Sequence, residues 1–348
     1  MRLDFALQKL AHKVLWMSGH LSYEPFSLPF KAPLRTAHGH WERREGFWLK
    51  WETATAVRYG EAAPVPGFGG MSLAAIKADL VRLGDSPSEA EWEAMVEQGG
   101  ELGFALGSLR GDQQQLLAAG PDYIPVAGLL PAGRGALARI EAQLELGFRT
   151  FKWKVGVADP RDEQGMLDEL LGRLPSGAKL RLDANGAWNR RVAERWLAVA
   201  AERPMIEFVE QPVAAADVDL LLGLAGDYPV TLALDEAVLG PQEFRFWQDQ
   251  GWPGVYVIKP ALWGDPFRLV QALTDAPADV VISSALETRV GSGMVIAVAF
   301  ALAGSSRAAG LGGWPLFADA SHDGPTALPF LKRKTAIALG DAAVGETR

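Results

Sequence analysis

Between residues 179 and 235 the chain contains three short apolar segments that each end in a carboxylate: KLRLD at 179–183, IEFVE at 206–210 and TLALD at 231–235. The steps from Asp183 to Glu210 and from Glu210 to Asp235 are nearly equal in length. One strand, one helix and two loops need roughly such a step. The spacing predicts parallel β-strands joined by helices, with the three carboxylates at the same end of three neighbouring strands.

Apolar segments of the same kind occur on both sides of this stretch and recur at nearly even intervals. The eight predicted strands are Ile124–Leu130, Thr150–Val155, Lys179–Asp183, Ile206–Glu210, Thr231–Asp235, Val255–Lys259, Val280–Ser284 and Ala308–Leu311. Eight strand–helix units are the number that closes a parallel (β/α)8 barrel. A doubly wound open sheet also alternates strands and helices, but it rarely has eight evenly spaced units, so we predict the barrel.

The first 120 residues follow a different pattern, with strands first and helices afterwards. We predict strands at Ser22–Leu28, Gly46–Trp51 and Ala56–Gly60, and helices at Leu73–Leu83, Glu89–Glu97 and Gln113–Ala119. Gly120-Pro121 interrupts both helix and strand. The chain is therefore expected to be an α/β protein in which an α+β domain (residues 1–120) precedes a barrel (residues 121–320).

Composition limits the kinds of site and partner. The 348 residues are 49% hydrophobic and 22% charged, with a formal net charge of −8, which predicts a large globular core. We find no basic stretch suited to nucleic acid and no apolar run of the roughly 18 residues that a membrane span needs. The absence of cysteine excludes disulfides, thiolate ligands and cysteine nucleophiles, and agrees with a cytoplasmic location. Any metal site is expected to consist of carboxylates, which suit Mg²⁺ or Mn²⁺.

The second predicted strand carries two lysines. In Phe151-Lys152-Trp153-Lys154-Val155 the alternation places both lysines on one face and three apolar residues on the other. An edge strand with a solvated lysine face would show the same alternation. Because Phe, Trp and Val on the opposite face indicate a covered strand, we expect Lys152 and Lys154 to point into the barrel mouth.

Asp183, Glu210 and Asp235 are candidate metal ligands. Three carboxylates that converge in one mouth repel one another unless a cation lies between them, and a divalent ion with hard oxygen ligands meets that need. A single Asp at the end of a strand is often just a helix N-cap, but three in register are poorly explained in that way.

Another lysine, Lys259, ends the sixth predicted strand. Lysines on strands two and six flank the carboxylates of strands three, four and five, so Lys154 and Lys259 are expected to face each other across the metal. Beside a cation the pKa of a lysine falls toward the range of a general base. The alternative is an ion pair of Lys259 with Asp235 or Glu236.

Several further polar residues are candidates for substrate binding. Arg181 and Asn185 share a strand face with Asp183, and Ser283 and Ser284 end the seventh strand. The two hydroxyls are suited to a substrate carboxylate, although a helix N-cap explains one of them equally well. Residues 310–313 are rich in glycine, which predicts open space near the mouth or simply a turn.

Together these motifs resemble the enolase superfamily. Lys-Trp-Lys (152–154), Asp-Ala-Asn (183–185), Glu-Gln-Pro (210–212), Asp-Glu (235–236) and Lys-Pro (259–260) are similar to the signature of its muconate-lactonizing subgroup. The resemblance covers nearly the whole chain. It implies a modified (β/α)8-type barrel, an N-terminal α+β capping domain, and a C-terminal segment (residues 321–348) that packs back on the capping domain.

Within the subgroup the chain resembles the o-succinylbenzoate synthase family. Pro-Leu-Arg-Thr (33–36), Arg-Glu-Gly (44–46), the loop Gly60–Gly69, Arg181 and Ser283-Ser284 carry that resemblance. It implies the dehydration of 2-succinyl-6-hydroxy-2,4-cyclohexadiene-1-carboxylate, a small carboxylate, in menaquinone or phylloquinone biosynthesis. Lys154 would remove and return the proton, Lys259 would stabilise the intermediate by its charge, and Lys152 would depress the pKa of Lys154.

Two other functions fit parts of the same pattern. An N-acylamino acid racemase or another epimerase of the subgroup would use Lys154 and Lys259 as two opposed bases. Dipeptide epimerases carry an Asp-x-Asp on strand eight, whereas Gly310–Gly313 has no acid. A catalytically inactive barrel that serves as a binding module is disfavoured, because all three ligands and all three lysines are present.

Overall fold

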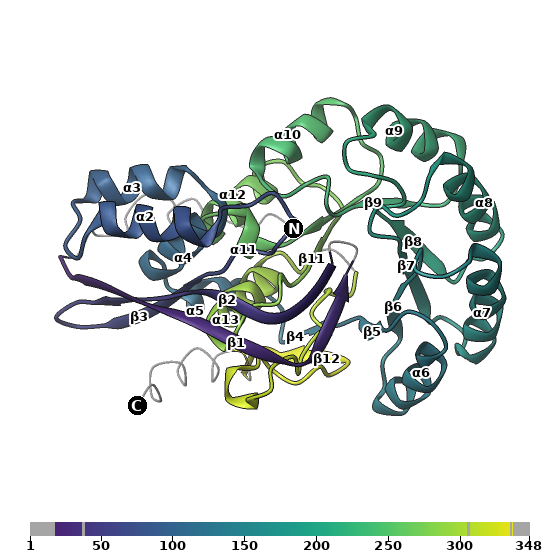
Figure 1. The fold of residues 1–348 in the computed structure, drawn as a ribbon, viewed down its shortest axis with the longest axis horizontal. Coiled ribbons are helices and arrows are strands. Elements are labelled where there is room, and N and C mark those ends of the chain that lie inside the picture. The colour runs from purple at the N-terminus through teal and green to yellow at the C-terminus, as the bar shows by residue number, and fades with distance from the viewer. Residues whose placement is uncertain (1–17, 37–38, 305–306, 335, 337–348) are drawn as a thin grey trace.

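The computed structural model describes residues 18–36, 39–304, 307–334 and 336. The N-terminal part contains a three-stranded antiparallel sheet in the order β1-β2-β3, followed by four helices (Figure 1). These elements are β1 (His20–Thr36), β2 (Gly39–Glu52), β3 (Val57–Ala62), α2 (Leu73–Leu83), α3 (Glu89–Glu97), α4 (Gly100–Arg110) and α5 (Gln113–Ala119). The predicted strands and helices of this region are confirmed, although β1 and β2 are longer than expected.

Helix α4 was missed by the sequence analysis because its sequence, GELGFALGSLR, contains three glycines. Glycine disfavours a helix interior by about 1 kcal/mol relative to alanine. The structure shows why glycine is needed here: a Cβ on Gly107 would lie 2.8 Å from Cγ of Asp265, at the start of a barrel helix. The close packing of α4 against the barrel therefore requires glycine, the residue type that made this helix hard to predict from the sequence.

The barrel contains a curved parallel sheet of seven strands in sequence order. These strands are β5 (Gly128–Leu130), β6 (Thr150–Lys154), β7 (Lys179–Asp183), β8 (Ile206–Glu210), β9 (Leu232–Leu234), β10 (Val255–Ile258) and β11 (Val280–Ile282). The predicted eighth strand appears as two isolated parallel bridges, Ala309 to Val126 and Gly310 to Ser283. Because Val126 precedes β5 and Ser283 follows β11, these bridges connect the two edges of the sheet.

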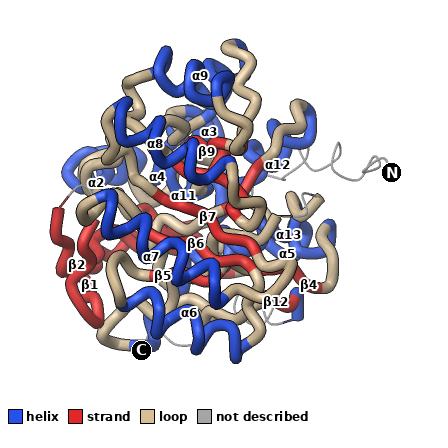
Figure 2. Tube along the Cα trace, turned by 90° about the vertical axis from the view of Figure 1, so that its right-hand side faces the viewer, coloured by secondary structure: helices blue, strands red, loops and turns tan. Residues whose placement is uncertain are grey.

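Helices cover the outside of this sheet and alternate with its strands, as the spacing predicted (Figures 1 and 2). They are α6 (Gly135–Leu146), α7 (Pro160–Arg173), α8 (Arg190–Ala201), α9 (Val218–Asp227), α10 (Pro241–Asp249), α11 (Pro260–Trp263), α12 (Pro266–Asp275) and α13 (Arg289–Ala301). Proline at the first turn of α7, α10, α11 and α12 helps to start these helices, since that position has no N–H partner to lose. The predicted α/β architecture, a modified (β/α)8-type barrel that follows an α+β domain, is thus confirmed.

The last described elements lie beside the barrel. The single turn η1 (Ala320–His322) is followed by β12 (Phe330–Lys332), which pairs antiparallel with β4 (Tyr123–Pro125). The ring of His322 stacks on Trp48 of β2 at 5.5 Å between centroids. We propose the division into residues 1–120, 121–320 and 321–348, of which 1–17 and 337–348 lie outside the described residues. None of the described helices is long and apolar enough to cross a membrane.

Candidate active site

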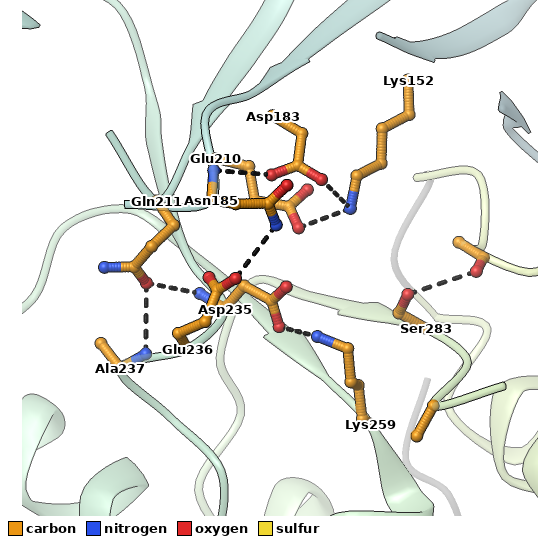
Figure 3. A network of polar contacts seen from close by, with 12 residues as sticks. Lys152, Asp183, Asn185, Glu210, Gln211, Asp235, Glu236, Ala237, Lys259 and Ser283 are labelled. Carbon is orange, nitrogen blue, oxygen red and sulfur yellow. Dashed lines mark hydrogen bonds and ion pairs between the residues drawn. The ribbon is translucent and has the colours of Figure 1, made fainter. Parts of the chain in front are cut away.

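Three carboxylates meet at the carboxyl ends of β7, β8 and β9 (Figure 3). The strand register pairs Asp183 with Glu210, and Glu210 with Ala233, two residues before Asp235. All three side chains are buried, with 1–3% of the residue surface exposed. The equal spacing in sequence thus brings them to one edge of the sheet, as predicted.

Ammonium groups lie against these carboxylates. Lys152 Nζ lies 2.9 Å from Asp183 and 2.6 Å from Glu210, and Lys259 forms an ion pair with Asp235. The two lysines approach the acids from different sides (Figure 3). The sequence analysis gave two interpretations of Lys259, a lysine that faces Lys154 across a metal or a partner of Asp235 or Glu236 in an ion pair. The structure shows the ion pair with Asp235. The observed β6 alternation, with Phe151 and Trp153 fully buried, excludes the alternative of a solvated edge strand.

Burial and like charges act strongly on the ionisation of this cluster. Burial, together with Asp183 and Asp235, raises the pKa of Glu210 to about 8 despite the nearby Lys152. Burial opposes the charge of Lys259, but Asp235 and Glu236 outweigh it and raise the pKa of this lysine.

The residues at this edge fit a hard divalent cation. Among the described residues, no three acidic or histidine side chains lie close enough to hold a metal ion in the present side-chain arrangement. The three carboxylates are engaged with Lys152 and Lys259 instead. The donors are nevertheless buried oxygens on adjacent strands, and burial together with the charges of Asp183 and Asp235 raises the pKa of Glu210. A divalent cation bound by these oxygens would offset the repulsion between the carboxylates.

Lys154 lies at the end of a short chain of side-chain hydrogen bonds. Its Nζ donates to Asn185 Oδ1 at 2.9 Å, and Asn185 Nδ2 donates to Glu236 Oε1 at 3.0 Å. Asn185 has a φ of 45°, a left-handed conformation that Asn tolerates better than most residues. Asn185, predicted to bind substrate, therefore contacts Lys154 directly in this structure.

Gln211 was quoted in the Glu-Gln-Pro motif but not assigned a role. Its Oε1 accepts hydrogen bonds from the backbone N–H groups of Asp235 (3.0 Å) and Ala237 (3.2 Å), and its Nε2 donates to the carbonyl of Val213. The side chain is fully buried and the residue has a φ of 37°. Gln211 thus sets the backbone position of the third carboxylate.

Arg181 was predicted to bind substrate, and the structure places its guanidinium inside the barrel. Its Nε donates to Glu207 at 2.6 Å, and its guanidinium lies 4.8 Å from the ring centroid of Phe208. The residue is 1% exposed. Two residues along a strand correspond to about 6.6 Å, so Arg181 shares a face with Asp183 but lies one layer deeper in the barrel.

Ser283 and Ser284 are placed near the mouth but are engaged within the protein. Ser283 Oγ donates to the carbonyl of Gly310 at 3.2 Å, and Ser284 Oγ donates to Glu287 at 2.6 Å. The expected open space at the glycines is found at Gly313 but not at Gly310. A Cβ on Gly310 would lie 2.7 Å from Ser283 Oγ, so this glycine serves close packing.

The loop that follows β3 reaches the mouth and adds a residue that the sequence analysis did not identify. Lys259 Nζ lies 5.0 Å from the ring centroid of Phe68, within the range of a cation–π contact. No local sequence pattern marks this contact, because it joins two residues far apart in the chain. The contact brings this loop to the mouth.

Comparisons with known proteins place this geometry in a family. The model of the family described as "Enolase C-terminal domain-like" matches residues 136–327. The o-succinylbenzoate synthase of Thermosynechococcus vestitus is 40% identical over 272 residues, covering 74% of this chain and 82% of the relative. That of Yersinia enterocolitica is 30% identical over 287 residues, covering 76% and 81%.

Solved structures agree with these matches. The crystal structure of o-succinylbenzoate synthase from Thermosynechococcus elongatus, complexed with Mg in its active site, has a TM-score of 0.77 and 35% identity, and covers 92% of this chain and 98% of that one. The L-Ala-D/L-Glu epimerase of Bacillus subtilis, at 20% identity and a TM-score of 0.73, covers 91% and 96% and shows the shared fold alone.

Proposed function

This chain belongs to the enolase superfamily and, within it, to the o-succinylbenzoate synthase family, and from this premise we propose that it catalyses the syn dehydration of 2-succinyl-6-hydroxy-2,4-cyclohexadiene-1-carboxylate to o-succinylbenzoate. The observation that carries the proposal is the arrangement at the strand ends. Lys154 and Lys259 come from β6 and from the end of β10, and the buried carboxylates of β7, β8 and β9 lie between these strands. We place the reaction in menaquinone or phylloquinone biosynthesis.

Asp183, Glu210 and Asp235 are the residues that would hold Mg²⁺. The crystal structure of the Thermosynechococcus elongatus relative holds Mg in its active site, and the oxygen donors here suit that ion. When bound, the ion supplies positive charge that stabilises an ene-diolate formed from a substrate carboxylate. Mn²⁺ has the same preference for oxygen ligands and is proposed as a substitute.

Lys154 carries out both proton transfers in this proposal. Its neutral amine takes the proton from the ring carbon that bears the carboxylate, and the electron pair of that C–H bond moves into the ene-diolate. The electron pair of the ene-diolate then forms the new C=C bond of the aromatic ring, and the C–O bond to the ring hydroxyl breaks with its pair leaving on oxygen. The Lys154 ammonium gives its proton to this departing hydroxide, which leaves as water. Asn185 orients the amine through the 2.9 Å hydrogen bond.

Lys259 keeps its charge throughout and faces the developing negative charge from the other side. Its ion pair with Asp235 and its contact with Phe68 favour the ammonium form. Lys152, which lies between Asp183 and Glu210, orients those carboxylates and acts on Lys154 as a neighbouring positive charge. Electrostatic terms of this kind are typically worth about 3–4 kcal/mol in the transition state.

The test is incubation of the purified protein with the cyclohexadiene substrate and Mg²⁺, with aromatisation followed by ultraviolet absorbance. Rapid appearance of o-succinylbenzoate is the expected result, and Lys154→Ala should abolish it. No aromatisation by correctly folded, metal-loaded protein would show that the proposed reaction is wrong.

A racemase is the second candidate, because lysines lie on both sides of the site. Incubation in D₂O with an N-acylamino acid that carries an α-proton separates the two functions. A racemase exchanges that proton from both faces, using Lys154 for one enantiomer and Lys259 for the other. If exchange and racemisation match dehydration in kcat/KM, racemisation is the primary function.

A further inference from the structure

Arg44 of β2 is buried at the contact between the capping domain and the barrel, and within the described structure its hydrogen bonds go to backbone carbonyls. Its guanidinium donates to Ala63 and Pro64, at the start of the loop after β3. It also donates to Ala285 (3.2 Å) and Leu286 (3.1 Å), in the turn after β11. One side chain with 3% exposure therefore connects two segments that lie far apart in the sequence.

Both segments lead directly to the mouth. The loop that begins at Ala63 carries Phe68, whose ring faces Lys259. The turn that contains Ala285 and Leu286 directly follows Ser283 and Ser284, and Leu286 adopts a left-handed φ of 65°. A guanidinium presents its five donors in one rigid plane, so it fixes the relative position of the carbonyls that it binds.

Two neighbours of Arg44 in the capping domain make further hydrogen bonds to the barrel. Glu61 of β3 is buried and accepts hydrogen bonds from the backbone N–H groups of Thr288 (3.1 Å) and Gly291 (2.9 Å), at the start of α13. Trp48 Nε1 donates to Thr288 Oγ1 at 3.1 Å. The carboxylates of Glu61 and Glu287 balance the buried charge of Arg44, although burial lowers the pKa of this arginine.

We propose that Arg44 is a positioning residue for the dehydration, which holds the Phe68 loop against the Ser283–Ser284 turn so that both stand at a set distance over the mouth. The inference rests on the proposed function for its kinetic consequence. It rests only on the hydrogen bonds above for its structural consequence. Arg44 itself touches neither substrate nor the reacting lysines.

Arg44→Met removes the donors and keeps most of the apolar volume, and Arg58→Met is the matched control. Arg58 also belongs to the capping domain and also donates to carbonyls, those of Leu109 and Arg110, but these bonds stay within that domain. We expect Arg44→Met to lower kcat/KM by roughly ten- to a hundredfold, mainly through KM, and Arg58→Met to leave it within about threefold. Arg44→Lys, with one charged group in place of the fork, should show an intermediate loss and serves if the Met variant does not fold.

A double-mutant cycle with Phe68→Ala distinguishes positioning from general support. If Arg44 acts by placing the Phe68 loop, Arg44→Met should cost far less in the Phe68→Ala background than in the wild type. Equal losses in the two backgrounds would overturn the proposal, as would equal losses for the Arg44 and Arg58 variants.

Hydrogen–deuterium exchange gives a readout that does not depend on activity. In Arg44→Met, peptides from residues 63–71 and from residues 283–288 should both exchange at least tenfold faster, while the Arg58 variant leaves them unchanged. Unchanged exchange at either segment would refute the role of Arg44 in holding the two segments together. If the wild type is inactive but the variants show this exchange pattern, the proposed reaction is wrong and the structural role of Arg44 is supported.

Discussion

Replacing Glu207 with Gln tests whether Arg181 belongs to the barrel interior or to the substrate site. Arg181 Nε lies 2.6 Å from Glu207, both side chains are at most 3% exposed, and Arg181 Nη2 has no hydrogen-bond partner among the described residues. Glu207 is thus the only carboxylate paired with Arg181 in the described structure. Breaking a buried ion pair by removing one partner typically costs about 3–5 kcal/mol, so we expect Glu207→Gln to lower the free energy of unfolding by about that amount.

Removing Arg181 instead of Glu207 should lower the free energy of unfolding by a smaller amount, because Glu207 keeps other partners. Without Arg181, Glu207 still accepts from Arg307 at 2.8 Å and lies 3.6 Å from Lys179. We therefore expect Arg181→Met to cost about 1–3 kcal/mol. Urea denaturation at pH 7, followed by tryptophan fluorescence, measures both changes, and KM for the substrate should stay within a factor of two in either variant.

The pH dependence of this difference has a definite sign. Burial opposes ionisation of Glu207, but Arg181, Lys179 and Arg307 outweigh it and hold its pKa below the ordinary 4.5. A depressed pKa in the folded state contributes stability that is present above the ordinary pKa and is lost as the pH falls through the folded-state value. The deficit of Glu207→Gln should thus be complete at pH 7 and shrink below about pH 4.5. A tenfold rise in KM for Arg181→Met with unchanged unfolding would instead assign Arg181 to the substrate.

Three further outcomes are expected. EDTA should abolish activity and Mg²⁺ or Mn²⁺ should restore it, because the three strand-end carboxylates need a cation; full turnover by metal-stripped protein would contradict their assignment. Deleting residues Gly67–Gly70 should lower kcat while far-UV circular dichroism stays unchanged, because we expect the loop to close over the mouth and exclude water; an unaltered rate would contradict that role. Lys154→Ala should lose essentially all dehydration, whereas Lys259→Ala loses only an electrostatic contribution of about a hundred- to thousandfold, and a larger loss for the Lys259 variant would reverse their roles.

The architecture and the strand-end acids were predictable from sequence because both depend on local spacing. Strand residues alternate between two faces, so the burial of Phe151 and Trp153 opposite Lys152 follows from their order in the strand. Parallel strands joined by helices end on the same side of a barrel, so a nearly even repeat of strand and helix brought Asp183 and Glu210 into register.

Depth within the barrel and contacts between domains were decided only by the tertiary structure. The alternation of strand residues predicts the face on which Arg181 lies. How deep its guanidinium sits in the barrel depends on its partner, which is Glu207 in the structure. Helix α4 forms despite its glycines because packing against the barrel outweighs local propensity. The hydrogen bonds of Arg44 to the turn after β11, and the contact of Phe68 with Lys259, join segments that are separated in sequence by most of the barrel. Neither leaves a local pattern in the sequence, because side-chain contacts across such separations are set by how the domains pack.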